Sequence, residues 1–408
     1  MKYIINHKSK NLKGSIKIPP SKSISNRALI LRSLNERINI KNLSESKDTM
    51  ILQKALNQIK KGKKKIFIGN CGTAMRFLTS YLSTKKQETT IYGNKRAHKR
   101  PISDLVTCLK LMGAKISYLG EKGFLPISIK GGKLKGGKVE IDGGKSSQMI
   151  SALILIASEY KKPIEIIIKN NIVSKDYITT SLKMISYFGI KNNFKKNVIY
   201  VDNGKLENKN LTIEGDWSCA AYWYNMASCS DKCDIKLYNL NPKSTQPDRI
   251  LTKIYKSINV DTYIKKDYIQ IIKNGAKTKK IHHNLINSPD IVPSLITTCV
   301  INKIKFKISG ISHLKHKESN RIEAMKKEIR KTGSLIKNID KNYILEFTNL
   351  SFEKLIFKSY WDHRITMSLT VFGLKNKIKI LNPEVVKKSY PNFWDEIKKI
   401  GFKITKCS

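Results

Sequence analysis

The sequence predicts an α/β (α+β) protein of two similar domains, and two observations carry this prediction. Its 408 residues exceed the length at which one hydrophobic core usually stops growing, so two domains of about 200 residues with a cleft between them are expected. One local pattern also recurs six times: an amphipathic helix, a residue suited to a left-handed C-cap, and a short β-like run. Helices that alternate with strands in this way are expected to pack on sheets.

The six cap positions fall three in each half of the chain. They are Gly62, Gly113, Gly189, Asn259, Gly333 and Gly401. The helix predicted over 101–112 shows the supporting features, because Pro101 stands at a plausible first position and the apolar residues after it form one stripe. Two further helices, 149–157 and 220–227, are apolar almost all round, which predicts that both lie buried inside their domains.

Compact basic clusters stand where helices are predicted to begin, over residues 22–27, 317–321, 362–364 and 388–391. Free backbone N–H groups and the positive end of the helix dipole favour anions there, and added Lys, Arg and Ser side chains make a receptor for phosphate or carboxylate. Just before the apolar stretch 149–157, the Ser146 and Ser147 hydroxyls suit a phosphate as well as they suit simple N-capping. The sequence therefore predicts small, strongly anionic ligands.

The net charge of +47 arises from 78 Lys and Arg residues against 31 Asp and Glu residues. Such an excess is typical of nucleic-acid-binding proteins, because phosphate contacts dominate their affinity. Here Lys is spread along the whole chain beside abundant Ile and Asn, as an A+T-biased genome produces, and no aromatic stacking motif accompanies it. We expect no nucleic-acid partner, although a positive field still raises the encounter rate of anionic substrates.

Composition also argues against a membrane protein, a secreted protein and a metalloprotein. No apolar run approaches the roughly 18 residues that a membrane helix needs, and residues 1–10 lack the apolar core of a signal peptide. The seven cysteines include no Cys-x-x-Cys pair, and no further ligands accompany Cys229 and Cys233. We expect a monomeric, cytoplasmic protein with no membrane partner, metal or cofactor.

Six motifs, in their order along nearly the whole chain, resemble those of the 5-enolpyruvylshikimate-3-phosphate (EPSP) synthase family. They are Pro20–Ala28 (PSKSISNRA), Gly69–Arg76 (GNCGTAMR), Arg100–Pro101, Ser146–Gln148 (SSQ), Lys317–Arg321 (KESNR) and Asp362–Arg364 (DHR). The resemblance implies two domains, each of three βαβαββ-type units, with the active site in the interdomain cleft. It assigns 1–19 plus 214–408 to the domain that carries phosphoenolpyruvate and catalytic groups, and 20–213 to the domain that mainly binds shikimate 3-phosphate.

The reaction implied by this resemblance belongs to the shikimate pathway of chorismate and aromatic amino-acid biosynthesis. The enolpyruvyl group of phosphoenolpyruvate is transferred to the 5-hydroxyl of shikimate 3-phosphate by addition and elimination, with release of phosphate. Two polyanions must then share one cleft, which explains a need for Lys and Arg from both domains, and Arg forks match carboxylate and phosphate oxygens well. Domain closure would bring the two sets of groups together.

The resemblance also implies which residues bind shikimate 3-phosphate. Ser146, Ser147 and Ser174 would hold its phosphate. Ser23 and Arg27 would address its carboxylate. Tyr177, which without the family pattern would be ordinary packing, would shape the ring site with Gln148. The full set is Lys22, Ser23, Arg27, Ser146, Ser147, Gln148, Ser174, Tyr177, Asp290, His313 and Lys317.

The phosphoenolpyruvate site implied in the same way combines cations with a glycine. Its members are Lys22, Asn70, Gly72, Arg100, Gln148, Arg321, Arg364 and Lys388. Gly72 would let the ligand approach the backbone and, by family analogy, leave room for glyphosate. From the residues alone, a simple turn at Gly72 is an equal alternative.

The reaction requires proton delivery to the methylene carbon, removal of the 5-hydroxyl proton, and reversal of the first step as phosphate leaves. The family pattern places Asp290 near the hydroxyl and Glu318 facing the methylene carbon, and names Lys22 as the third catalytic group. The proton assignments among these three stay open at this point, with Lys388 as a further cationic partner.

The chain departs from the family pattern at three places, and one related family shares part of that pattern. His313 stands where many members have Asn, Asn320 replaces Asp, and Ile365–Thr366 replaces Met-Ala; the loss of acidity at Asn320 could loosen a neighbouring basic residue. The related transferase that acts on UDP-N-acetylglucosamine prefers a Lys-Asn start and a reactive loop cysteine, whereas this chain has Lys22–Ser23. Cys71 is then interpreted as structural, and Cys108 as a helix residue.

Overall fold

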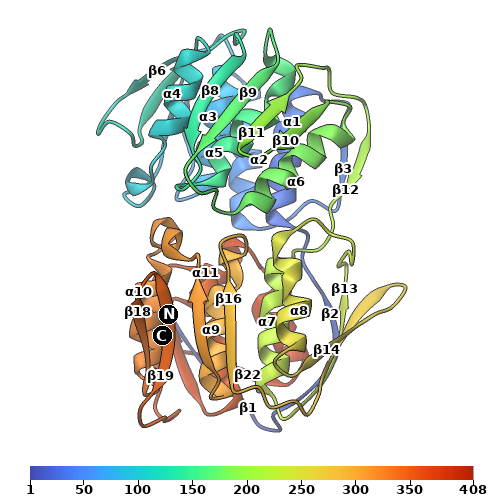
Figure 1. Cartoon of the computed structure of the whole chain (residues 1–408), viewed down its shortest axis with the longest axis vertical. Coiled ribbons are helices and arrows are strands. Elements are labelled where there is room, and N and C mark those ends of the chain that lie inside the picture. Colours follow the sequence, from blue (N-terminus) through green and yellow to red (C-terminus); the bar gives the residue numbers. More distant parts are fainter. Residues whose placement is uncertain (408) are drawn as a thin grey trace. The chain divides into compact units, whose positions relative to one another are not determined.

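A computed structural model describes residues 1–407 of the chain (Figure 1). It forms two compact units. Unit 1 contains Met1–Pro20 together with the described residues from Glu214 onward, and unit 2 is Ser21–Ile213. Among the described residues, no helix has both the length and the apolar character needed to cross a bilayer.

Unit 2 alternates helices and strands. Its helices are α1 (Lys22–Leu34), α2 (Lys47–Lys60), α3 (Gly72–Ser83), α4 (Ser103–Leu111), α5 (Ser147–Leu155) and α6 (Lys175–Tyr187). Its strands are β3 (Asn39–Lys41), β4 (Lys65–Phe67), β5 (Thr89–Tyr92), β6 (Lys115–Tyr118), β7 (Ile127–Lys130), β8 (Gly137–Asp142), β9 (Ile164–Lys169), β10 (Asn192–Lys195), β11 (Val198–Val201) and β12 (Asn210–Thr212).

Unit 1 follows the same plan. Its helices are α7 (Trp217–Cys229), α8 (Leu251–Lys256), α9 (Val292–Ile301), α10 (Arg321–Arg330), α11 (His363–Leu369) and α12 (Phe393–Lys399). Its strands are β1 (Lys2–His7), β2 (Asn11–Lys17), β13 (Lys232–Tyr238), β14 (Val260–Ile264), β15 (Tyr268–Lys273), β16 (Lys280–Asn284), β17 (Lys305–Ser309), β18 (Ser334–Ile339), β19 (Asn342–Phe347), β20 (Ile356–Lys358), β21 (Ile378–Leu381) and β22 (Phe402–Cys407).

Five four-stranded sheets share one topology. In the sheet β16-β17-β19-β18, the first pair is parallel and the other two pairs are antiparallel. The chain reaches β17 through α9, reaches β18 through α10, and closes with a β18–β19 hairpin, which is a βαβαββ unit. The predicted α/β fold with repeated units is therefore confirmed.

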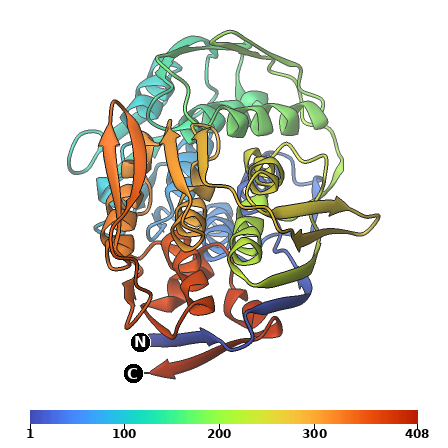
Figure 2. The same cartoon turned by 60° about the horizontal axis from the view of Figure 1, so that its bottom comes forward.

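The sixth sheet is smaller than expected, because it contains only the parallel pair β3 and β12. After α2 and Gly62 the chain passes directly into β4, which is the edge strand of the next sheet, so no residues remain for a hairpin. The N-terminus has the opposite role in unit 1. There β1 pairs with both β21 and β22, and β2 pairs with β13, so the first two strands complete two sheets (Figure 2).

Three inner helices form the centre of each unit. In unit 1, α7, α9 and α11 run side by side and are buried at every residue (Figure 1). In unit 2, α1, α3 and α5 pack together, and α3 and α5 are buried almost throughout. The predicted burial of the apolar stretches 149–157 and 220–227 is confirmed, because every residue of both stretches is buried.

Five of the six predicted caps are confirmed. The glycines at positions 62, 113, 189, 333 and 401 all have φ between 74° and 105°, which is the left-handed region. The prediction for Asn259 was wrong, because this residue does not adopt positive φ. Its side chain instead accepts a hydrogen bond from the Ser228 hydroxyl at 2.5 Å and donates to the Ser228 carbonyl at 3.1 Å.

The helix predicted over 101–112 begins two residues late, at Ser103. Ile102 is its N-cap residue, and the Ile102 N–H donates to the carbonyl of Gly123. Pro101 lies outside the helix, and its carbonyl accepts a hydrogen bond from the Arg76 guanidinium at 3.1 Å.

Candidate active site

The N-terminal ends of the inner helices lie together within each unit. In unit 2, Arg76 of α3 donates to Gln148 of α5 at 3.0 Å, and Arg27 of α1 donates to Ser151 of α5 at 3.2 Å. In unit 1, Arg364 of α11 donates at 2.7 Å to Asp290, which lies in the short helix η4 (Pro289–Ile291) just before α9. Arg364 also donates to the Tyr222 hydroxyl of α7 at 3.4 Å. Three positive helix ends therefore converge in each unit, which favours bound anions.

Two serines in unit 2 stand at helix starts without capping them. Ser146 is the N-cap residue of α5 and Ser174 is the N-cap residue of α6, and neither side chain makes a capping hydrogen bond. They follow β8 and β9, which are parallel neighbours, so their loops leave the same sheet edge. The Ser146 hydroxyl therefore does not perform the simple N-capping that the sequence left as an equal alternative. Ser147 is the first residue of α5 and is also buried.

Gln148 is held in one orientation by two partners. Its Oε1 accepts from Arg76 at 3.0 Å, and its Nε2 donates to the Thr73 hydroxyl at 3.0 Å. Because both partners belong to α3, Gln148 ties the starts of α3 and α5 together.

Arg27 is buried, with 2% of its surface exposed. Its guanidinium donates to the hydroxyls of Ser181 and Ser151 and to the carbonyls of Ser23 and Tyr177, at 2.7 to 3.2 Å. Burial lowers the pKa of Arg27 to about 10, so it stays charged at neutral pH. With four hydrogen bonds made inside the protein, Arg27 has little donor capacity left, and its guanidinium chiefly fixes the α1, α5 and α6 starts.

Lys22, the first residue of α1, pairs with Asp48 of α2 at 3.2 Å. Both side chains are buried. Sequence reasoning missed Asp48, because an acidic residue in the first turn of a helix is common for the helix alone. Only the fold shows that it holds a predicted catalytic lysine.

Gly72 begins α3, directly beneath the Arg100 guanidinium. A Cβ added at Gly72 would overlap three atoms of that guanidinium. Asn70 lies two residues before Gly72, ahead of the N-cap residue Cys71, whose Sγ accepts from the Ala74 N–H. The structure therefore gives Gly72 a steric reason that goes beyond a turn, and it gives Cys71 the structural role that was predicted.

If Arg100 binds phosphoenolpyruvate, as the resemblance implies, Gly72→Ala should raise the KM for this substrate by about tenfold or more while lowering kcat less, because the new methyl group would displace the Arg100 guanidinium. Steady-state kinetics would measure both constants. Gly132→Ala is the matched control, since a Cβ there meets nothing within 4 Å. An unchanged KM in Gly72→Ala would show that Arg100 does not contact the substrate.

In unit 1, one guanidinium binds three carboxylates. Arg321 Nη1 lies 2.7 Å from Asp290 Oδ1, Nη2 lies 2.6 Å from Glu318 Oε2, and Nε lies 2.9 Å from Asp362 Oδ2. Arg321 is 1% exposed and Asp362 is fully buried. The surrounding carboxylates raise the pKa of Arg321 above its usual value, although burial alone would lower it. Asp362 also caps α11 and was not among the predicted site residues, although its motif was noted.

Asp290 accepts from a second arginine, Arg364, at 2.7 Å. Burial raises the pKa of Asp290, but Arg364, Arg321 and Lys317 together outweigh it, and the pKa lies well below its ordinary value. In this arrangement Asp290 is a carboxylate at any neutral pH. Glu318 lies between Arg321 and Lys388, whose Nζ is 3.7 Å away.

The predicted phosphoenolpyruvate residues divide between the units. Lys22, Asn70, Gly72, Arg100 and Gln148 belong to unit 2, and Arg321, Arg364 and Lys388 belong to unit 1. The predicted catalytic carboxylates, with His313 and Lys317, are also in unit 1. No group of three or more His, Cys, Asp or Glu side chains in residues 1–407 could hold a metal ion.

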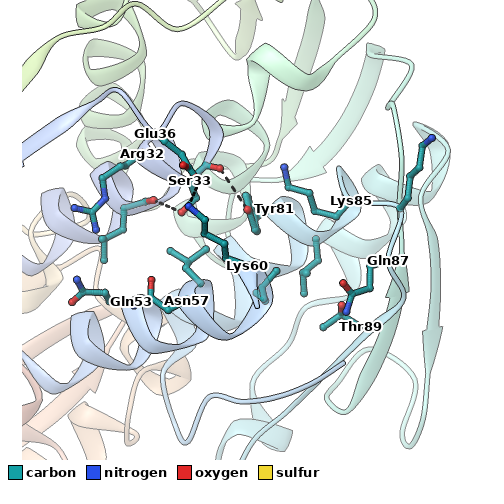
Figure 3. Close-up of a pocket in the computed structure, with 15 residues that line it drawn as sticks. Arg32, Ser33, Glu36, Gln53, Asn57, Lys60, Tyr81, Lys85, Gln87 and Thr89 are labelled. Atoms are coloured by element: carbon teal, nitrogen blue, oxygen red, sulfur yellow. Dashed lines mark hydrogen bonds and ion pairs between the residues drawn. The ribbon is translucent and has the colours of Figure 1, made fainter. Parts of the chain in front are cut away.

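A separate pocket of about 540 Å³ contains none of the predicted site residues (Figure 3). It lies where α1, α2 and α3 end, and its lining includes Arg32, Lys60, Lys85 and Lys86. Lys60 pairs with Glu36 at 2.6 Å, as Figure 3 shows. Cations near helix C-termini stabilise the helix dipole, so this lining needs no ligand to explain it.

The family model described as EPSP synthase (3-phosphoshikimate 1-carboxyvinyltransferase) matches residues 6–66 and 37–397. The chain belongs to the EPSP synthase family. A 3-phosphoshikimate 1-carboxyvinyltransferase of Bacteroides fragilis is 36% identical, with 99% of each chain covered. One of Buchnera aphidicola subsp. Cinara cedri is 35% identical, with 94% of each chain covered.

The fold agrees with solved EPSP synthase structures. The EPSP synthase of Acinetobacter baumannii superposes with a TM-score of 0.78 at 24% identity, and the match covers 99% of this chain and 100% of that chain. A second structure of EPSP synthase from the same organism gives a TM-score of 0.76. At this identity, the comparison supports the architecture alone.

Two departures from the EPSP synthase pattern leave local structure intact. Asn320 is the N-cap residue of α10 and accepts from the Glu323 N–H, which an Asp would also do. The Thr366 hydroxyl donates to the Asp362 carbonyl one turn back at 3.1 Å, and Ile365 is fully buried. The expected loosening at Asn320 finds no support in the geometry, because the neighbouring Arg321 keeps three carboxylate partners.

His313, the third departure, is a buried and uncharged ring. It is 5% exposed, and within the part of the chain that the structure describes neither ring nitrogen has a hydrogen-bond partner. Burial, assisted by the charge of Lys317, lowers the pKa of His313 to about 3. A buried polar ring with no internal partner is expected to bind a ligand or water.

His313→Asn should make the protein less sensitive to acid. The pKa of His313 is about 3 in the folded state, whereas the ordinary pKa of histidine is 6.5, so the unfolded state binds the proton first as pH falls. The wild type then loses roughly 2 kcal/mol more of its free energy of unfolding than the variant between about pH 6.5 and pH 4.5. Urea unfolding at both pH values measures this difference. Equal losses in the two proteins would show that His313 is protonated in the folded state.

Proposed function

We propose that this chain transfers the enolpyruvyl group of phosphoenolpyruvate to the 5-hydroxyl of shikimate 3-phosphate, releasing phosphate. Membership of the EPSP synthase family supports the reaction. The observation that carries the site is the Arg321 cluster, in which one buried guanidinium joins Asp290 and Glu318, the two carboxylates expected to handle protons.

Unit 2 holds shikimate 3-phosphate. The hydroxyls of Ser146, Ser147 and Ser174 and the backbone N–H groups at the starts of α5 and α6 bind its phosphate. Gln148, fixed by Thr73 and Arg76, contacts the ring. Ser23 and Tyr177 flank it, and Arg27 holds these elements in place.

Unit 1 supplies Arg321, Arg364 and Lys388 to phosphoenolpyruvate, and unit 2 supplies Lys22, Asn70 and Arg100 with Gly72. Two polyanions cannot share a site unless cations from several directions offset their repulsion. This division of labour between the two units is therefore part of the proposal.

Substrate binding changes the chemistry of Asp290. Two arginines, Arg321 and Arg364, lower the pKa of Asp290. The same two guanidinium groups are proposed to bind phosphoenolpyruvate. When the substrate anion takes their N–H groups, their hold on Asp290 weakens and its pKa rises toward the range in which it accepts a proton. Asp290 then orients the 5-hydroxyl and accepts its proton during attack.

The remaining proton steps fall to Glu318 and Lys22. Glu318 enters the cycle protonated, delivers its proton to the methylene carbon during addition and takes a proton back from that carbon as phosphate leaves. The proton that Asp290 accepted from the 5-hydroxyl passes to the departing phosphate, which returns both carboxyl groups to their starting states. Lys22, held by Asp48, neutralises the departing phosphate, and Lys388 does the same beside Glu318.

The test is phosphate release from phosphoenolpyruvate by the purified protein with different acceptors. Release should require shikimate 3-phosphate and should not occur with UDP-N-acetylglucosamine or with no acceptor. Release with UDP-N-acetylglucosamine alone would assign the chain to the related transferase. Release with neither acceptor would overturn the proposed activity.

We also propose that the protein is cytoplasmic and monomeric. The seven cysteines, all within residues 1–407, form no disulfide with one another and six of them are buried, which suits a reducing compartment. Sedimentation analysis tests the monomer, and a dimer at micromolar concentration would contradict it.

A further inference from the structure

Asp248 is a buried carboxyl group that the proposed chemistry does not use. It lies in the short helix η3 (Pro247–Ile250) and is 1% exposed. The Ser218 hydroxyl, in the first turn of α7, donates to its Oδ2. Its Oδ1 is buried and has no hydrogen-bond partner among residues 1–407. A charge with a bare buried oxygen is costly, so this carboxyl has a physical reason to bind a proton.

Two hydrogen bonds connect the turn that carries Asp248 to elements of the candidate active site. The Trp217 N–H donates to Gln246 Oε1 at 3.1 Å, at the start of α7. The Ser288 hydroxyl donates to the Pro247 carbonyl at 3.1 Å, two residues before Asp290. Asp248 therefore lies in a turn that contacts both the start of α7 and the segment that carries Asp290.

The charges that face Asp248 come from every neighbouring element. Asp216 lies at the start of α7, Asp290 at the start of α9, and Arg364 at the start of α11, while Glu214 reaches the same turn through Gln246 at 2.8 Å. Burial, then the charge of Asp290, raise the pKa of Asp248 to about 7, although Arg364 and the Ser218 hydrogen bond lower it.

We propose that Asp248 is a positioning residue that takes up a proton from solvent when a carboxylate or phosphate anion binds at Arg364. An ionised Asp248 would repel that anion and share the attraction of Arg364. When Asp248 is protonated, the positive charge of Arg364 attracts only Asp290 and the substrate anion. The inference rests on the proposed function, because it assumes that phosphoenolpyruvate reaches Arg364.

The proposal predicts a specific pH dependence. Anion binding makes proton uptake at Asp248 more favourable, so the affinity for phosphoenolpyruvate falls as pH rises through about 7. Asp248→Asn cannot ionise and should hold its KM near the low-pH value. Other groups, including the substrate phosphate, titrate in this range, so the informative quantity is the difference between the two proteins.

The experiment measures the KM for phosphoenolpyruvate from about pH 6 to about pH 8.5 at saturating shikimate 3-phosphate. The KM of the wild type should rise roughly three- to tenfold more than that of Asp248→Asn. The control is Asp234→Asn on β13, whose carboxylate accepts from Gln270 at 2.6 Å and should give the wild-type profile. Parallel profiles for wild type and Asp248→Asn would overturn the proposal.

Ser218→Ala gives a second, opposite test that does not alter the carboxyl. Removing the hydroxyl removes a hydrogen bond that favours the ionised form, so the rise in KM should move to higher pH. An inflection that stays in place or moves to lower pH would contradict the proposal.

Calorimetry separates this inference from the proposed reaction. Titration of phosphoenolpyruvate into protein without an acceptor, so that no turnover occurs, in two buffers of different ionisation enthalpy near pH 7 counts the protons taken up on binding. The wild type should take up more than Asp248→Asn, and equal uptake would refute the role of Asp248. Absence of phosphate release in the wild type would instead refute the proposed function.

Discussion

Glu318→Gln should lower kcat for phosphate release by about 10²- to 10⁴-fold while changing the KM for phosphoenolpyruvate only a few-fold, which is the usual loss when a positioned acid–base group is removed. Glutamine keeps the size of the side chain and can still accept a hydrogen bond from Arg321, which lies 2.6 Å from Glu318. It cannot carry a proton to and from the methylene carbon. Steady-state and single-turnover kinetics would measure the loss.

The same helix offers a control. Glu323, in the first turn of α10, is solvent-exposed and pairs with Lys326 at 2.9 Å. Glu323→Gln should keep kcat within about a factor of two, since exposed ion pairs contribute little. If Glu318→Gln retained a wild-type kcat, Glu318 would not be a proton carrier and the mechanism proposed above would fail.

Arg321→Met should lower the free energy of unfolding by roughly 3–5 kcal/mol, because it leaves buried carboxylates without their common partner. Asp362 would suffer most, since it is fully buried. The loss should shrink in acid, where Asp290 and its neighbours can be neutralised by protons. Urea unfolding at neutral and acid pH would test both statements.

Arg330→Met, in the exposed last turn of the same helix, serves as its reference and should change stability by less than about 0.5 kcal/mol. Equal unfolding midpoints for Arg321→Met and the wild type would mean that the three carboxylates are satisfied by other groups.

Local chemistry explains why the repeated fold could be predicted from sequence. A glycine that must end a helix in the left-handed region is visible without any tertiary information, and Gly189 and Gly401 were predicted in this way. Asn259 shows where such reasoning fails. Its amide has a tertiary partner, Ser228, 31 residues away, and this contact replaces the cap conformation. The reduced sixth sheet was equally hidden, because it depends on where β4 pairs.

The sequence predicted the clusters of charged residues in the candidate site, but it did not predict which side chains contact one another. The pairing of Arg364 with Asp290 spans 74 residues and that of Lys22 with Asp48 spans 26 residues, so no local pattern reveals either. Asp248 was missed for the same reason, since nothing in its neighbouring residues indicates that it lies behind Asp290. Residue types indicated the anionic ligands, whereas the fold determined which side chains hold the charged groups in place.

The measurement that tests the central claim most directly is phosphorus NMR of the purified protein with phosphoenolpyruvate and shikimate 3-phosphate. The account predicts that the phosphoenolpyruvate resonance disappears as inorganic phosphate appears, with one new phosphate monoester resonance from 5-enolpyruvylshikimate 3-phosphate formed for each phosphate released. Phosphate release without that new resonance, or persistence of both substrates, would contradict it.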